Sequence, residues 1–359
     1  MSQTNSASSK HTIQFGIYTL GDLAKDPHTG EWNTPKQRLK ELVEAAKLAD
    51  DAGIEVFGVG EHHRLDFAVS SPPVVLAAIA QATRQIRLTS ATTVLSTADP
   101  VRVFEDFATL DLLSDGRAEI ISSRGAFLEP FPLFGYKLEQ HQEVFEEHIR
   151  LLQLLNQKER VTWQGNYRSA IEHSEIAPRP DQEELPLWIG VGGTTATAEL
   201  AGTCGTGLVL AILKGDPLQY KPLVEAYREA GRQAGHADDR LKAGLTGHGY
   251  IADTAEQART EFYPYYANYK AQFKRPDAAY TPLAKEQFDA LAAPDTAFAV
   301  GSPEQVAEKI VRMHREFGLT RYMLQMDVGG VPFKKLARAI ELLATEVRPL
   351  VDHALMNES

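Results

Sequence analysis

Short apolar runs alternate with longer segments of helical periodicity along almost the whole chain. The first apolar run is Ile13–Leu20, and the next segment opens with Thr34 and Pro35, a helix N-cap residue followed by proline at the first helical position. Apolar residues then recur at helical spacing until Gly53, which can adopt the left-handed conformation that ends a helix. The run Ile54–Gly60 follows. This succession predicts strand, helix and strand, the repeating unit of an α/β protein.

The unit recurs until eight strands are predicted, nearly all of them followed by helices. The predicted strands are Ile13–Leu20, Ile54–Gly60, Ile86–Leu95, Arg117–Ser123, Leu185–Val191, Gly207–Leu213, Gly244–Ala252 and Arg321–Asp327. Eight such units favour a closed parallel barrel over an open doubly wound sheet. Because no linker divides the chain, we predict one α/β domain, a (β/α)8 TIM barrel over residues 13–352, after a disordered tail over residues 1–12. The last helix is expected to bury a face formed by Leu336, Ile340, Leu343, Val347 and Leu350.

Two segments are longer than a chain of eight strand–helix units requires. Val161–Ile176, after the fourth helix, predicts a β-hairpin that turns around Gly165 and Asn166. Phe262–Val300, after the seventh strand, is longer than a helix and a loop need, and it begins with a tyrosine-rich stretch. Its part over residues 274–295 has few large apolar residues. We therefore expect a mobile lid, which begins at the face where barrel enzymes carry their chemistry.

Charge and cysteine content narrow the classes of partner. The chain of 359 residues has 37 basic and 48 acidic residues, a formal net charge of −11, which disfavours nucleic acid and anionic membranes as partners. A single cysteine, Cys204, excludes a disulfide framework and a cysteine-based metal site. No apolar run is long enough to span a membrane, and the polar N-terminus lacks the apolar region of a secretory signal. A cytoplasmic protein is expected.

The sequence Glu61-His62-His63 directly follows the second predicted strand, at the rim where barrel enzymes place catalytic groups. Because neighbouring residues of a strand point to opposite faces, we expect only one of the two imidazoles to reach the cavity. That imidazole could serve as a general base or a hydrogen-bond donor, or the two histidines could only shape the loop through hydrogen bonds. The first strand contains no histidine and the chain has no HExxH motif, so no metal site is expected.

Three further strand ends carry residues suited to an anionic or a flat ligand. Arg124 follows the fourth strand and could bind an anion, with Gly125 allowing close backbone approach, or could form an ordinary salt bridge. The sequence GVGGTT over residues 190–195 follows the fifth strand and opens a helix, so it could cradle a phosphate or form only a tight turn. It is not a dinucleotide fingerprint, because Thr195 stands where the third glycine belongs. Small residues over 90–93 would allow a flat ligand to lie against the third strand.

Several of these motifs, taken in order, resemble the bacterial luciferase-like family of flavin-dependent monooxygenases. The segments that carry the resemblance are GEHH (60–63), SATTVLSTADPVR (90–102), LDLLSDGR (110–117), SSRGAF (122–127), FPLFGY (131–136) and GSPEQV (301–306). The resemblance extends from Gln14 to about Leu350. The family fold is an eight-stranded barrel, which agrees with the strand count.

The resemblance implies that reduced flavin mononucleotide (FMN) binds at the carboxyl-terminal mouth of the barrel. It places the catalytic histidine at His62, a non-proline cis peptide that supports the flavin ring at Ala91–Thr92, and the residue beside the reactive flavin carbon at Ser123, where a luciferase has cysteine. The residues assigned to the cofactor are Ala91, Thr92, Ser123, Arg124, Gly125, Gly192, Gly193, Thr194 and Thr197, and His62 and Ser123 are assigned to catalysis. Two positions depart from the luciferases: Gln142 stands for a second phosphate-binding arginine, and Gly193 replaces an acidic residue.

The resemblance implies a monooxygenase that uses reduced FMN and O2 to oxidise a small organic substrate, without light emission. The family often receives reduced flavin from a separate flavin reductase, with which the absence of a nicotinamide fingerprint is compatible, and a homodimer is expected. Two alternatives stay open. One is an F420-dependent hydride-transfer oxidoreductase on the same barrel, and the other is a non-catalytic flavin-binding subunit, against which the retention of His62 argues.

Overall fold

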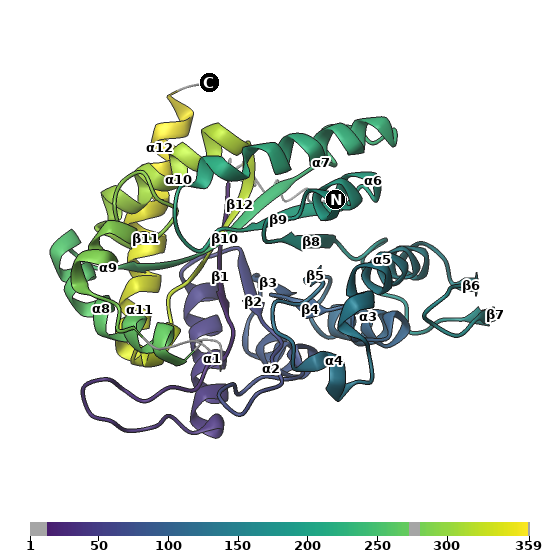
Figure 1. Cartoon of the computed structure of the whole chain (residues 1–359), viewed down its shortest axis with the longest axis horizontal. Helices are drawn as coiled ribbons and strands as arrows, with labels where there is room; N and C mark the ends of the chain where they lie inside the picture. Colours follow the sequence, from purple (N-terminus) through teal and green to yellow (C-terminus); the bar gives the residue numbers. More distant parts are fainter. Residues whose placement is uncertain (1–12, 273–280, 358–359) are drawn as a thin grey trace, which may run out of the picture.

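A closed barrel of parallel strands forms the centre of the molecule (Figure 1). The computed structural model describes residues 13–272 and 281–357, so the expected tail over residues 1–12 lies outside the described residues. Within these ranges the barrel strands are β1 (Gln14–Thr19), β2 (Val56–Val59), β3 (Arg87–Ser90), β5 (Ala118–Ser123), β8 (Leu187–Val191), β9 (Gly207–Ala211), β10 (Ala243–Ile251) and β12 (Leu319–Gln325). Each pairs in parallel with the next, and the ring closes where β12 pairs with β1. The predicted (β/α)8 barrel is confirmed.

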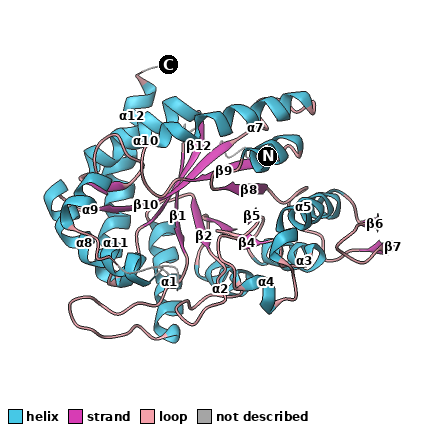
Figure 2. Ribbon diagram, viewed as in Figure 1, coloured by secondary structure: helices cyan, strands magenta, loops and turns pink. Residues whose placement is uncertain are grey.

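Helices surround the barrel and connect its strands (Figure 2). They are α1 (Pro35–Asp51), α2 (Pro72–Ala82), α3 (Pro100–Leu113), α4 (Pro130–Leu133), α5 (His141–Gln157), α6 (Thr195–Thr203), α7 (Lys221–Gln233), α8 (Ala255–Gln272), α9 (Lys285–Leu291), α10 (Pro303–Phe317), α11 (Phe333–Leu342) and α12 (Arg348–Met356). The side chains of Thr34, Asp99 and Ser302 cap α1, α3 and α10 by accepting hydrogen bonds from backbone N–H groups of the first turn. Among residues 13–272 and 281–357, no helix is both long and apolar enough to cross a membrane.

Glycines in the strands leave room inside the barrel for larger side chains. A Cβ on Gly16 would lie 2.7 Å from Cγ of Met323, and a Cβ on Gly58 would lie 2.9 Å from Cβ of Ala91. The apolar side chains that fill this interior layer are Tyr18, Val56, Ala91, Ile121, Trp188, Val209 and Met323. The helices pack against the outside of the strands in a second, larger core.

A buried ion pair closes the amino-terminal end of the barrel. Glu119 on β5 accepts hydrogen bonds from Arg321 on β12 at 2.8 and 3.0 Å and from Nε1 of Trp188 at 3.0 Å. The guanidinium of Arg321 also lies over the Trp188 ring, 4.4 Å from its centroid. Although burial alone would raise it, the Arg321 charge holds the pKa of Glu119 below its usual value. These side chains fill the barrel interior at its amino-terminal end.

The predicted hairpin is confirmed, but its turn differs from the prediction. β6 (Arg160–Trp163) and β7 (Ile171–Glu175) pair antiparallel and project from the barrel next to α5 in Figure 1. Residues 164–170 connect them as a loop instead of a two-residue turn. The reason is Glu147 on α5, whose carboxylate accepts hydrogen bonds from several backbone N–H groups of that loop.

The segment predicted as a lid is largely helical and well packed where the structure describes it. α8 continues to Gln272, residues 273–280 lie outside the described residues, and α9 and β11 (Ala299–Gly301) follow. The expectation that residues 274–295 pack loosely is wrong at Phe288, which is fully buried. Its ring packs against Phe262, Tyr263 and Phe298 and so anchors α9 on the core. That the segment closes over the mouth of the barrel stays a prediction.

The closing helical segment buries a face that shifts along its length. The first four of the predicted apolar residues are buried, but Leu350 is 39% exposed and Val351 is buried in its place. A turn of π-helix over Leu343–Val347 lies between α11 and α12. Because a π-turn holds an additional residue, the apolar face moves on by one position, which a regular helical period does not anticipate.

Candidate active site

A cavity of about 620 Å³ opens at the carboxyl ends of the barrel strands. This volume lies within the range of about 300–1,000 Å³ that is common for small-molecule sites. One side is formed by residues at and after the ends of β2, β3, β5 and β8, and the other by residues of β1, β9, β10, β12 and α8. Barrel enzymes carry their active sites at this end.

Most of the predicted site residues line this cavity. Those that do are His62, Ala91, Thr92, Ser123, Arg124, Gly125, Gly192, Gly193 and Thr194. Thr197 differs, because it lies on α6, is almost fully buried and does not line the cavity. Its hydroxyl has no hydrogen-bond partner within the described residues. The structure therefore brings together the predicted groups from four different strand ends.

His62 borders the cavity between two aromatic rings. Its imidazole stacks on Phe67 with 4.0 Å between ring centroids and meets the edge of Phe127 at 4.6 Å. Nε2 is buried and has no hydrogen-bond partner among residues 13–272 and 281–357. Burial first, and then the nearby His63 and Arg64, lower the pKa of His62 to about 3. The imidazole is therefore neutral at pH 7 and can exchange hydrogen bonds with a ligand without carrying a charge.

His63 also borders the cavity, which corrects the expectation that it points away. Residues 60–63 lie beyond the end of β2, so the alternation of side chains along a strand does not apply to them. Nε2 of His63 lies 2.8 Å from Oε1 of Glu61, and the other carboxylate oxygen of Glu61 accepts a hydrogen bond from the N–H of Val94 at 2.9 Å. Glu61 therefore pairs with His63, whereas Nε2 of His62 has no such partner and can hydrogen-bond to a ligand.

A non-proline cis peptide joins Ala91 and Thr92, as the resemblance implied. The strand predicted over residues 86–95 is interrupted there and forms two strands, β3 and β4 (Thr93–Val94). The hydroxyl oxygens of Thr92 and Ser123 lie 2.6 Å apart, and the N–H of Gly125 donates to the Ser123 hydroxyl at 3.2 Å. These residues form one hydrogen-bonded wall of the cavity, built from the ends of β3 and β5.

Arg124 carries a positive charge at the rim of this wall. Its guanidinium donates hydrogen bonds of 2.7 Å to the Gln142 side chain and of 2.7 Å to the Thr194 hydroxyl. Nε2 of His141 lies 3.4 Å from the same guanidinium. No carboxylate of the described part of the chain forms an ion pair with Arg124, and burial is the only influence that lowers its pKa. The charge is therefore available to an anionic ligand.

The start of α6 offers an open cradle beside Arg124. Thr194 is the N-cap residue, but its side chain makes no capping hydrogen bond to the helix. A Cβ on Gly192 or on Gly193 would meet no atom within 4 Å, so a ligand could approach the backbone closely there. Amide groups at a helix N-terminus favour negative charge. Together with Arg124, this arrangement suits a phosphate group.

Two polar residues outside the predicted set also line the cavity. His248 on β10 is 2% exposed, and Gln325 at the end of β12 is fully buried. Nδ1 of His248 and both amide atoms of Gln325 have no hydrogen-bond partner within the described residues. The signal in the sequence was a polar residue within or at the end of a predicted barrel strand, His248 in the seventh and Gln325 in the eighth.

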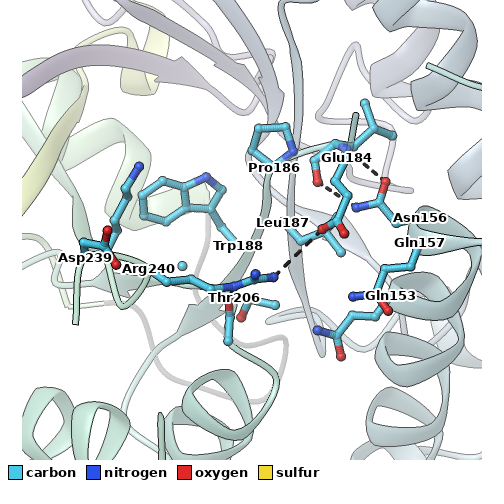
Figure 3. A pocket seen from close by; sticks show the side chains of 14 residues that line it. Gln153, Asn156, Gln157, Glu184, Pro186, Leu187, Trp188, Thr206, Asp239 and Arg240 are labelled. Carbon is cyan, nitrogen blue, oxygen red and sulfur yellow. Dashed lines mark hydrogen bonds and ion pairs between the residues drawn. The ribbon is translucent and has the colours of Figure 1, made fainter. Parts of the chain in front are cut away.

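A second cavity, of about 360 Å³, lies at the opposite end of the barrel (Figure 3). Three of its polar side chains are engaged with the surrounding chain: Gln153, Asn156 and Arg240 each donate a hydrogen bond to a backbone carbonyl group. Arg240 also pairs with Glu184 across the cavity in Figure 3. Within the described residues, none that line this cavity has a buried, unpartnered side-chain atom. The cavity at the mouth is therefore the candidate active site.

The chain resembles known proteins in both sequence and structure. It is 23% identical to the oxygenase component of a flavin-dependent trigonelline monooxygenase from Acinetobacter baylyi, over 94% of this chain and 95% of that protein. The monooxygenase RslO1 from Streptomyces bottropensis superposes with a TM-score of 0.81 at 25% identity, over 94% of this chain and 99% of that chain.

A second solved structure shares the fold at lower identity. The oxygenating constituent of 3,6-diketocamphane monooxygenase from Pseudomonas putida, in complex with FMN, superposes with a TM-score of 0.74 at 18% identity, over 94% of this chain and 98% of that chain. A family model described as luciferase-like monooxygenase matches residues 13–321. The protein therefore belongs to the luciferase-like monooxygenase family.

Proposed function

We propose that the protein is a monooxygenase that uses reduced FMN and O2 to oxidise a small organic substrate in the cavity at the mouth of the barrel. The observation that carries the proposal is that one cavity holds both a site suited to a phosphate and a neutral histidine with a free ring nitrogen. Membership of the family supports it, as do the flavin-dependent relative and the FMN complex of a protein with the same fold.

The residues present suit FMN. The phosphate would be held by Arg124, the Thr194 hydroxyl and the open backbone of Gly192 and Gly193 at the start of α6. The flavin ring would lie against the wall formed by Ala91, Thr92, Ser123 and Gly125. Thr197 stays a predicted phosphate contact: it does not line the cavity, but its buried hydroxyl has no hydrogen-bond partner among the described residues.

Reduced FMN, when bound, supplies the two electrons with which O2 is activated. The chain contributes a neutral imidazole, because the pKa of His62 is lowered to about 3. His62 would therefore hold a proton or accept a hydrogen bond at Nε2 and would not act as a cationic acid. The rings of Phe67 and Phe127 cover the imidazole and keep water away from it.

Two proposals concern partners. The relative from Acinetobacter baylyi is named an oxygenase component, and we propose that a separate flavin reductase likewise supplies reduced FMN to this chain. We also propose a homodimer, supported by the exposed apolar side chains of Val74 on α2 and of Leu112 and Leu113 on α3, which packs against α2. Light scattering after size-exclusion chromatography tests the dimer, which Leu112→Glu should weaken.

Cofactor titration tests the proposed function. Purified protein is titrated under nitrogen with reduced FMN, oxidised FMN and F420, and each complex is then mixed with O2. We expect FMN to bind, F420 to bind much more weakly, and re-oxidation of the bound reduced FMN to differ in rate between the wild type and His62→Phe. Preferential binding of F420 would favour hydride transfer. FMN binding with identical re-oxidation in both proteins would favour a non-catalytic flavin-binding subunit.

A further inference from the structure

His248 and Gln325 lie side by side at the mouth of the barrel. They are register partners in the parallel pair of β10 and β12, so their side chains share the inner face of the barrel. In the ring of strands, β10 and β12 stand opposite β3 and β5, which carry the cis peptide and Arg124 at their ends. The pair therefore faces the proposed flavin site from across the cavity.

The pair presents three buried polar atoms that make no hydrogen bond to any other described residue, and a side-chain interaction with Gln325 opposes the lowering of the His248 pKa. These are Nδ1 of His248 and both the nitrogen and the oxygen of the Gln325 amide. Both residues are nine-tenths or more buried. Buried polar side-chain atoms are nearly always hydrogen-bonded, and one imidazole nitrogen cannot pair with both the N–H and the oxygen of the Gln325 amide. The amide therefore calls for a further partner that enters the cavity. A ligand that carries a hydrogen-bond donor and an acceptor along one edge could pair with both the oxygen and the nitrogen of the Gln325 amide.

The side chains that line the cavity beside the pair are aromatic, apolar or neutral. His248 meets the edge of the Tyr269 ring at 5.2 Å, and Tyr18, Ala211, Leu213 and Thr246 also line this side. Burial, and then the charge of Lys270, lower the pKa of His248 to about 4, so the imidazole is neutral at pH 7.

The carboxylates and guanidinium groups that line the cavity belong to its other side. They are Glu61 and Arg64 after β2, and Arg124 and Glu129 after β5. A charged group beside Gln325 would thus be buried without a counter-ion in the lining, which is costly. The side of the cavity around His248 and Gln325 therefore favours a flat, neutral molecule.

We propose that His248 and Gln325 form a substrate-recognition site for an uncharged planar compound whose ring carries a lactam or another cis-amide edge. The amide N–H of the substrate would donate to the Gln325 oxygen, its carbonyl would accept from the Gln325 nitrogen, and Nδ1 of His248 would make a further hydrogen bond. The ring would lie between Tyr18 and Tyr269, opposite the flavin. This inference rests on the proposed function, because it assigns the other half of the cavity to FMN.

Four bicyclic aromatic probes test the inference. Quinolin-2(1H)-one carries a lactam edge, coumarin replaces its N–H by oxygen, and naphthalene has neither group, while quinoline-2-carboxylate adds a negative charge. Each is titrated calorimetrically into the FMN-loaded wild type, Gln325→Leu, His248→Phe and, as a matched control, Thr246→Val. Thr246 lines the same side of the cavity, but its hydroxyl already donates to the Leu210 carbonyl.

We expect the wild type to bind the lactam roughly 5- to 100-fold more tightly than coumarin, because coumarin leaves the Gln325 oxygen unpaired. Gln325→Leu should abolish this preference, His248→Phe should reduce it, and Thr246→Val should retain it. Equal binding of lactam and coumarin by the wild type, a preference retained in Gln325→Leu, or tighter binding of the carboxylate would overturn the inference.

FMN affinity is measured on the same samples, and it shows whether a negative result contradicts the recognition site or the proposed function. Normal FMN binding without a lactam preference contradicts only the recognition site. A wild type that binds no FMN contradicts the proposed function. If Gln325→Leu folds, as judged by its thermal unfolding, but binds FMN much more weakly, then the amide serves the flavin and the inference is wrong.

Discussion

The guanidinium of Arg124, at the end of β5, donates a hydrogen bond of 2.7 Å to the hydroxyl of Thr194, the N-cap residue of α6. This bond links two residues 70 positions apart and uses the hydroxyl that would otherwise cap the helix. The free amide groups of α6 and the cation therefore meet at one point of the cavity. An anion bound there would be held by both, which is the basis of the proposed phosphate site.

His62→Phe should preserve FMN binding and lose product formation. The substitution keeps a ring between Phe67 and Phe127 but removes the free nitrogen. Loss of one well-placed hydrogen-bonding group at a reacting centre commonly costs about 10²- to 10³-fold in rate. Product and hydrogen peroxide are measured together at saturating FMN. Full product yield with unchanged peroxide release would show that His62 is structural.

The same variant should be less sensitive to acid. The folded-state pKa of His62 is lowered to about 3, so below pH 6.5 the unfolded chain binds a proton at this position that the folded protein does not bind. The wild type therefore loses stability as the pH falls from 6.5 towards 3. Between pH 7 and pH 5 the free energy of unfolding should fall by roughly 2 kcal/mol more in the wild type than in His62→Phe. Urea unfolding at both pH values checks this, and parallel losses would contradict it.

Glu119→Gln should destabilise the barrel without altering the cavity. The substitution leaves the buried charge of Arg321 without its carboxylate partner, at the end of the barrel opposite the active site. Breaking one side of a buried ion pair costs about 3–5 kcal/mol. The free energy of unfolding in urea measures the loss. Glu44→Gln on the exposed surface of α1 is the control and should cost less than about 1 kcal/mol.

Lys309→Met should loosen the segment between α9 and β11. The buried ammonium of Lys309 donates hydrogen bonds to the backbone carbonyl groups of Ala293, Thr296 and Phe298 at 2.6, 3.1 and 2.8 Å. Methionine fills a similar volume but leaves these carbonyl groups unpaired, at a cost of about 1–3 kcal/mol for each buried group that stays unsatisfied. Hydrogen exchange should increase over residues 292–298 and stay unchanged at the hairpin of β6 and β7. Unchanged exchange over 292–298 would contradict the structural role of this lysine.

Most of the fold could be predicted because each βα unit carries local signals. Thr34, Asp99 and Ser302 mark helix starts through their own side chains, and the order of apolar runs sets the strand count. The shift from Leu350 to Val351 could not be predicted, since it depends on a π-turn that the apolar pattern does not reveal. The loop of the hairpin depends on Glu147, a partner distant in sequence.

The candidate site was predictable on one side only. His62, Ser123 and Arg124 belong to motifs that a family resemblance can identify from neighbouring residues. His248 lies within β10 and Gln325 ends β12, and only the pairing of these two strands brings them together. Their lack of hydrogen-bond partners is a property of the folded cavity, which no local pattern encodes.

The most direct test of the account compares FMN with riboflavin, which lacks the phosphate. Fluorescence quenching gives the affinity of both flavins for the wild type, for Arg124→Ala and for the surface control Arg102→Ala, whose side chain is exposed on α3. We predict that Arg124→Ala weakens FMN binding by about 10- to 100-fold and leaves riboflavin binding unchanged, so that the preference for FMN falls by the same factor. An Arg124→Ala protein that still prefers FMN to riboflavin as strongly as the wild type does would contradict the account.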